Sequence, residues 1–229
     1  MDVFGKLQLK LHENPEQLEK DSLDSLVEVA QSAFDKNGQP TYDDVVEHIV
    51  PASTFITAEI DENIVGFSST DRKADTAYAV GLAVHEDFQG EGIGKMARTR
   101  GVMEEINGED MVTTRTQNPA VLSYMQDLFN GYPRQDEQTP AAVRSSLENL
   151  ARELDPESQF DSNNLVMEAA YPEAMYDEIP QHELKPFTDR ALDYEKGDAL
   201  LIGGTVSQEE VEEAYIEMAD DRDYEVEFL

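Results

Sequence analysis

The stretch VGLAVHEDFQGEGIGKMARTRGVMEE, residues 80–105, decides the fold because it joins an apolar strand to a helix through three glycines at alternate positions. Gly90, Gly92 and Gly94 each weaken regular structure, since glycine loses the most backbone freedom on folding. Free N–H groups at the start of a helix bind anions, and the helix dipole adds about half a positive charge there. Glycines also let the main chain curl around a phosphate without Cβ atoms in the way. The spacing therefore predicts a loop that binds a diphosphate.

Two common phosphate-binding motifs do not fit this loop. The dinucleotide fingerprint G-x-G-x-x-G requires a glycine where this chain has Lys95. The Walker motif G-x-x-x-x-G-K-[ST] requires a glycine at Gln89 and a hydroxyl-bearing residue at Met96. The pattern that does fit is Q-x-x-G-x-G, which runs from Gln89 to Gly94.

On these residues the chain resembles the GNAT superfamily of N-acetyltransferases, whose acetyl-CoA motif Q/R-x-x-G-x-G/A follows an apolar strand. The resemblance covers about residues 54–132, including VTTRTQNPAVLSYMQDLFNGYP at 112–133, which is similar to the family's fifth strand and fourth helix. It implies an α+β fold with a twisted, mostly antiparallel sheet flanked by helices. It also implies that the sheet is splayed between strands 4 and 5, where the pantetheine arm of acetyl-CoA would lie.

The resemblance further implies which residues contact the cofactor. The strand-edge backbone of Leu82, Ala83 and Val84 would contact the pantetheine, and the N–H of Val84 would stabilise the oxyanion. Asn118, at the start of the next helix, would also contact acetyl-CoA. The pyrophosphate would be held by the backbone amides of the glycine loop, namely Gln89, Gly90, Glu91, Gly92, Ile93, Gly94 and Lys95.

Tyr124 is the candidate general acid for the departing thiolate, and it lies six residues after Asn118, one fewer than in the family pattern. A tyrosine hydroxyl, with a reference pKa of about 10, lies within about two units of a thiol near 8.5. The alternative is that Tyr124 packs on the helical stripe Val121, Tyr124 and Leu128. The general base is open among Glu59, His85, Glu86 and a water relay.

Composition favours one folded intracellular domain. The 229 residues suit a single GNAT-like domain over 1–229, with a core at about 1–132 and a completion and extension at about 133–229. We expect the extension to form either a cap over the site or a homodimer contact. Cysteine is absent, and the four histidines show no ligand spacing, so no metal site is expected. The first residues resemble neither a signal nor a transit peptide, which predicts a cytoplasmic protein.

The charge of the chain is extreme, with 50 acidic against 17 basic residues and a net charge of -33. The acids alternate with periodic apolar residues, which favours a folded domain over disorder. Because salt shortens the screening length from roughly 10 Å at 0.1 M to roughly 3 Å at 1 M, such a chain suits a saline cytoplasm, as in a halophilic archaeon. The same charge argues against nucleic acid and membrane lipid as partners.

Periodicity predicts helices and strands around the glycine loop. Asn118 followed by a proline predicts a helix start, and Ser207 with Glu210 predicts another. Residues 171–198 show no clear helical or strand periodicity, and we expect them to form a long ordered excursion from the regular elements. Strands are predicted at 4–11, in a meander over 54–84, at 110–116, 163–171 and 198–206 and near the C-terminus, and helices at 15–38, 41–50, 92–107, from 118, at 141–154 and from 207.

Two functions from different classes remain after this reasoning. The first is an N-acetyltransferase that moves the acetyl group of acetyl-CoA to a primary amine, either a small amine or a protein amino group. The second is an acyl-CoA-binding sensor or scaffold without turnover. The basic residues Lys95, Arg98 and Arg100 are either paired charges on a helix or local compensation for the cofactor's phosphates.

Overall fold

The computed structural model of the protein describes residues 7–12, 15–34, 40–49 and 52–220. Contacts within the chain form two compact units. Unit 1 comprises Met1–Asp71, Ala79–Ile106 and Gln208–Leu229, and unit 2 comprises Arg72–Tyr78 and Asn107–Ser207.

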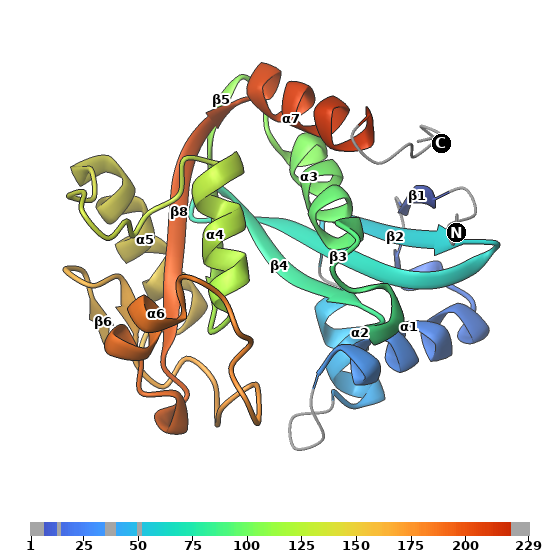
Figure 1. Ribbon diagram of the computed structural model, residues 1–229, viewed down its shortest axis with the longest axis horizontal. Coiled ribbons are helices and arrows are strands. Elements are labelled where there is room, and N and C mark those ends of the chain that lie inside the picture. Colours follow the sequence, from blue (N-terminus) through green and yellow to red (C-terminus); the bar gives the residue numbers. More distant parts are fainter. Residues whose placement is uncertain (1–6, 13–14, 35–39, 50–51, 221–229) are drawn as a thin grey trace. The chain divides into compact units, whose positions relative to one another are not determined.

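Unit 1 is a sheet with helices packed on both faces (Figure 1). Its strands follow the order β1 (Leu7–His12), β2 (Thr54–Ile60), β3 (Asn63–Lys73) and β4 (Thr76–Val84), of which β3 and β4 continue into unit 2. The helices are α1 (Lys20–Ala33), α2 (Tyr42–Ile49), α3 (Ile93–Glu105) and α7 (Gln208–Asp220), with short 3-10 turns at Pro15–Gln17 and Glu86–Phe88.

Strand β2 supplies both cores of unit 1 because successive side chains point to opposite faces of a sheet. Every residue of this strand is buried. Ile56, Ala58 and Ile60 pack with α3 and α7, whereas Phe55 packs with α1 and α2. At the end of α3, the Glu105 carboxylate accepts hydrogen bonds from Ser53 and Thr54 at 2.6 and 2.5 Å, which fixes this helix to the start of β2.

Unit 2 is built around one long antiparallel pair. Strand β5 (Glu109–Thr116) pairs with β8 (Ala199–Ser207) along its whole length, and two short strands, β7 (Val166–Met167) and β6 (Phe160–Asp161), follow β8. Figure 1 shows α4 and α5 beside β8. The helices are α4 (Pro119–Leu128), α5 (Ala141–Leu154) and α6 (Lys185–Ala191), with a 3-10 turn at Tyr194–Lys196.

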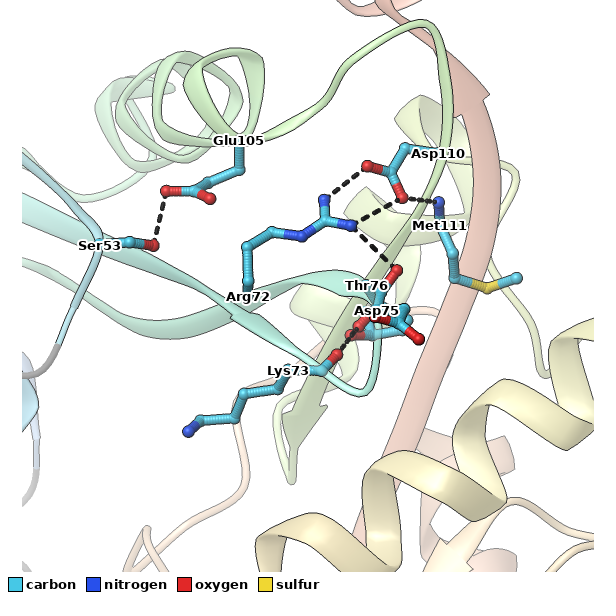
Figure 2. Close-up of polar contacts among 9 residues, drawn as sticks. Ser53, Arg72, Lys73, Asp75, Thr76, Glu105, Asp110 and Met111 are labelled. Carbon is cyan, nitrogen blue, oxygen red and sulfur yellow. Dashed lines mark hydrogen bonds and ion pairs between the residues drawn. The ribbon is translucent and has the colours of Figure 1, made fainter.

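The turn between β3 and β4 is attached to the first residues of β5 within unit 2 (Figure 2). The Arg72 guanidinium donates to the Asp110 carboxylate at 2.5 and 3.5 Å and to the Asp75 carbonyl oxygen at 3.0 Å. The hydroxyl groups of Thr76 and Thr113 lie 2.7 Å apart. The start of β4 therefore lies beside β5, and these two strands run parallel.

The predicted fold class is confirmed, because each unit has a mostly antiparallel sheet flanked by helices. The single domain and the splay between strands 4 and 5 stay predictions. Helices 92–107 and 141–154 and strands 110–116 and 198–206 agree with the structure to within two residues at each end. The first helix was predicted from Pro15 but begins at Lys20, and the predicted last strand lies outside the described residues.

The strand predicted at 163–171 is wrong over most of its length. Only Val166–Met167 forms a strand, because Leu165 and Ala169 on either side have φ angles of 57° and 48°. Left-handed backbone cannot continue a ladder. The residues 171–198 contain α6 and a 3-10 turn, in agreement with the ordered excursion that was predicted.

Candidate functional site

Glycine is needed at the three positions of the loop before α3 for two different structural reasons. Gly90 and Gly92 have φ angles of 82° and 81°, in the left-handed region that disfavours other residues. Gly94 lies in the first turn of α3, where a Cβ atom would stand 3.2 Å from Cγ2 of Val84 and 3.4 Å from Cδ2 of Leu82. The first two glycines therefore shape the loop, and the third lets α3 begin close against β4.

The start of α3 presents main-chain amides. Its first helical hydrogen bond runs from the Met96 amide to the Gly92 carbonyl oxygen at 3.1 Å. The N–H groups of Ile93, Gly94 and Lys95 therefore have no acceptor within α3. Gly92 has no side chain to cap them. A Cβ atom at Gly90 would meet no atom within 4 Å. These features fit an anionic group such as a pyrophosphate.

Gln89 closes this loop through both its backbone and its side chain. Its amide donates to the Glu86 carbonyl oxygen at 3.3 Å, and its Nε2 donates to the Val84 carbonyl oxygen at 3.0 Å. The Gln89 amide, which is the first of the amides predicted to bind the pyrophosphate, is therefore already bonded within the protein. The loop geometry explains why the motif begins with a glutamine.

The end of β4 directs alternate backbone groups to opposite edges of the strand. The amide of His85 donates to the Val65 carbonyl oxygen on β3 at 2.9 Å. By alternation, the N–H groups of Val84 and Leu82 point away from β3. The Ala83 side chain, only 3 % exposed, packs with the α1 and α2 core. The Val84 N–H is therefore not used in pairing with β3, and its oxyanion role stays a prediction.

The basic residues of α3 have different environments. Arg98 is buried, and Arg100 forms an ion pair with Glu104 one turn along the helix. Lys95 is exposed in the first turn. The paired-charge interpretation therefore holds for Arg100, whereas Lys95 is the residue placed to add positive charge beside the glycine loop.

In unit 2, Asn118 caps α4 as predicted. Its Oδ1 accepts a hydrogen bond from the Ala120 amide at 2.9 Å, and its own amide donates to the Thr116 hydroxyl at 2.9 Å. The remaining side-chain group, Nδ2, lies 3.4 Å from the Tyr176 hydroxyl. The asparagine therefore fixes the helix start with its oxygen and presents its amide nitrogen to Tyr176.

Tyr124 is 5 % exposed and packs edge-on against Phe129, with ring centroids 5.3 Å apart and an interplanar angle of 87°. This environment agrees with the packing interpretation of the stripe Val121, Tyr124 and Leu128. A packed ring can still direct its hydroxyl at a substrate, so the catalytic role stays a prediction.

Two of the predicted base candidates already have structural partners. The Glu59 carboxylate accepts from Lys10 Nζ at 2.5 Å and from the Thr57 hydroxyl at 3.3 Å. His85 Nδ1 accepts from the Asp87 amide at 3.3 Å and caps the turn Glu86–Phe88. The Glu86 amide donates to the Ser32 hydroxyl at 2.9 Å, and its side chain is exposed. Glu59 and His85 therefore hold the fold together locally.

His12 gives unit 1 a predicted pH dependence. Its Nε2 lies 2.9 Å from the Thr57 hydroxyl, and burial lowers its pKa below the ordinary value of 6.5, with Glu59 opposing the shift and Lys10 adding to it. Because the folded pKa is depressed, the contribution of neutral His12 is fully present above pH 6.5 and is lost as the pH falls below it. The free energy of unfolding of wild type relative to His12→Gln should therefore decrease between pH 7.5 and 5.5.

Urea unfolding at each pH measures this difference, and His85→Gln serves as the control for loss of a histidine elsewhere. A difference between wild type and His12→Gln that stays constant across this pH range would contradict the prediction.

The sequence did not identify a pair of contacts at the junction of β5 and α4. Gln117 is 2 % exposed; its Nε2 donates to the Asp198 carbonyl oxygen at 2.9 Å and its Oε1 accepts from the Met175 amide at 2.8 Å. Gln117 and Asn118 therefore bind the consecutive residues Met175 and Tyr176. The only sequence signal was a polar pair directly after a strand, and it gave no indication of the partners.

Residues 23–120 match the model of the acetyltransferase (GNAT) family. This GNAT match contains the glycine loop and Asn118 but ends before Tyr124. No curated protein gave a significant sequence match.

Solved acetyltransferase structures resemble this chain at low identity. The Escherichia coli ribosomal-protein-S18-alanine N-acetyltransferase is 12 % identical, with 87 % of this chain and 94 % of that chain covered and a TM-score of 0.49. A Bacillus subtilis acetyltransferase in complex with CoA is 16 % identical, with 88 % and 99 % covered and a TM-score of 0.46. The PaiA N-acetyltransferase of Thermoplasma acidophilum in complex with coenzyme A is 17 % identical, with 58 % and 93 % covered and a TM-score of 0.41. Such scores transfer no residue roles.

The described residues show neither a membrane-spanning helix nor a cluster of metal ligands. No helix among them combines the length and the apolar character needed to cross a bilayer. Within the same ranges, no group of three or more His, Asp or Glu side chains is arranged to hold a metal ion.

Proposed function

We propose that this protein is a GNAT-family N-acetyltransferase that transfers the acetyl group of acetyl-CoA to a primary amine by direct attack on the thioester. The observation that carries this proposal is the loop from Gln89 to Gly94, in which two left-handed glycines precede an uncapped helix start. The same loop lies inside the segment that matches the acetyltransferase family.

In unit 1, the amides at the start of α3 bind the pyrophosphate of acetyl-CoA, and exposed Lys95 adds positive charge. This local charge matters because a chain of net charge -33 repels a phosphate-bearing ligand at long range. The backbone groups of Leu82 and Val84 that point away from β3 bind the pantetheine arm, whereas those of Ala83 face β3, and the Val84 N–H stabilises the oxyanion. Acetyl-CoA supplies the activated acetyl group.

In unit 2, Asn118 contacts the cofactor and Tyr124 serves as the general acid. The acceptor amine must lose a proton before attack, because a lysine-like amine has a reference pKa of about 10.4. Its nitrogen then forms the new C–N bond as the C–S bond breaks. The nitrogen's proton leaves through water, and the Tyr124 hydroxyl gives a proton to the sulfur and regains one from solvent.

Calorimetry and a free-thiol assay test this proposal together, both in 1 M KCl so that the acidic chain is screened. Acetyl-CoA is expected to bind, and a panel of primary amines is expected to release free thiol. Binding without thiol release for any amine would favour an acyl-CoA-binding module. If acetyl-CoA does not bind at all, both functions fail.

A further inference from the structure

The Gln89 side chain closes a short ring of chain that begins at Val84. The 3-10 turn Glu86–Phe88 returns the chain toward the end of β4, and the Gln89 amide ends this turn by donating to the Glu86 carbonyl oxygen at 3.3 Å. The side chain then reaches back along the chain, and its Nε2 donates to the Val84 carbonyl oxygen at 3.0 Å. The first residue of the glycine motif is therefore bonded to the last residue of the preceding strand.

The bonded carbonyl belongs to the residue that the proposed function makes the oxyanion donor. The N–H and the C=O of one strand residue point to the same edge of the strand. Because the His85 amide faces β3 and donates to the Val65 carbonyl oxygen at 2.9 Å, both groups of Val84 face away from β3. Gln89 Nε2 therefore contacts Val84 on the edge of β4 that also carries the Val84 N–H.

Two hydrogen bonds fix the peptide group between Val84 and His85. Its C=O accepts from Gln89 Nε2, and its N–H donates to Val65. On the other side of Val84, the buried Ala83 side chain packs with the α1 and α2 core. Loss of the Gln89 bond would leave this peptide group with the β3 bond as its remaining anchor. The direction of the Val84 N–H would then be less well defined.

We propose that Gln89 is a positioning residue for acetyl transfer, and that its side chain acts through the Val84 backbone instead of on the phosphates of acetyl-CoA. This inference rests on the proposed function. The Gln89 side chain exchanges no proton and forms no covalent bond during the transfer. It keeps the Val84 N–H directed at the thioester carbonyl oxygen, on which negative charge develops as the amine attacks.

Gln89→Met tests this role because methionine has a similar length and lacks the donor. Gln208→Met is the matched control, since Gln208 is also exposed in unit 1 and its Nε2 donates to the Glu212 carboxylate at 2.8 Å. Gln89→Arg returns a donor to the position. Thiol release with a saturating concentration of the primary amine that wild type acetylates fastest gives kcat. Calorimetry gives the dissociation constant of acetyl-CoA, and both are measured in 1 M KCl.

Gln89→Met is expected to lower kcat by about tenfold, which is less than the factor of about 10²–10³ for outright loss of an oxyanion donor. The dissociation constant of acetyl-CoA should stay within about twofold of wild type, because the amides that bind the pyrophosphate are unchanged. Gln208→Met should match wild type in both quantities, and Gln89→Arg should recover most of kcat.

Infrared difference spectra give a second readout that needs no turnover. Acetyl-CoA labelled with ¹³C at the thioester carbonyl is bound to each variant, and the carbonyl stretching frequency is measured. A hydrogen bond to this oxygen lowers the frequency. Wild type and Gln208→Met should therefore show a downward shift relative to free acetyl-CoA, and Gln89→Met should show a smaller one.

The outcomes separate the inference from the function on which it rests. Weaker acetyl-CoA binding by Gln89→Met with an unchanged kcat would overturn the positioning role and make the side chain a cofactor contact. An unchanged kcat and an unchanged carbonyl frequency in this variant would also overturn it, and both results leave the acetyltransferase standing. Absence of thiol release with every amine would instead overturn the proposed function and the positioning role with it.

Discussion

Gly90→Leu is expected to weaken acetyl-CoA binding by at least about 100-fold. The loop holds an anion through hydrogen bonds from main-chain amides, and a bond to a charged group contributes about 1.5–3 kcal/mol. A leucine side chain at Gly90 would occupy space that is now open and would strain a backbone whose φ angle is 82°. Losing one or two of these bonds accounts for a factor of about 100 or more. Calorimetric titration with acetyl-CoA in 1 M KCl measures the effect.

Gly108 offers a matched control for the strain that this substitution introduces. Its φ angle is 76°, and a Cβ atom there would likewise meet no atom within 4 Å. Gly90→Leu and Gly108→Leu should therefore each lower the free energy of unfolding by about 1–2 kcal/mol, the usual cost of a left-handed L-residue. Only the first should affect acetyl-CoA. If both variants bound acetyl-CoA as wild type does, the glycine loop would not be the phosphate site.

Local sequence was enough to predict the parts of the candidate site that lie within one turn or loop. The spacing of Gly90, Gly92 and Gly94 indicated the loop, and the cap at Asn118 followed from a polar side chain before a proline. Both depend on residues only a few positions apart. Backbone geometry and capping of this kind are decided by neighbours in the chain.

The contacts that depend on distant residues were not predictable in the same way. Gln117 and Met175 are held together across 58 positions, and the segment that carries Met175 has no apolar period to place it. The partners of Glu59 could not be anticipated either, because Lys10 reaches it only once β1 and β2 pair. An acidic chain offers many carboxylates, and only the fold distinguishes a buried, paired one such as Glu59 from those on the surface.

Tyr124→Phe is expected to lower kcat by about 100-fold while the dissociation constant of acetyl-CoA stays within about twofold of wild type. General acid catalysis contributes about 10²–10⁴ to a rate, and this substitution removes the hydroxyl alone. The ring keeps its edge-on contact with Phe129, so the buried packing of α4 is preserved. Loss of kcat without loss of binding separates a catalytic hydroxyl from a packing residue, because a packing defect would also lower the stability or the affinity.

Tyr176→Phe is the matched control for Tyr124→Phe, since it removes a second hydroxyl that lies 3.4 Å from the Asn118 amide nitrogen. The acid role of Tyr124 predicts that this control keeps kcat within a fewfold of wild type. Thiol release with a saturating amine, measured for both variants beside thermal unfolding, decides between the two residues. Full turnover in Tyr124→Phe together with a large loss in Tyr176→Phe would move the proton donor from α4 to the segment that Gln117 and Asn118 hold.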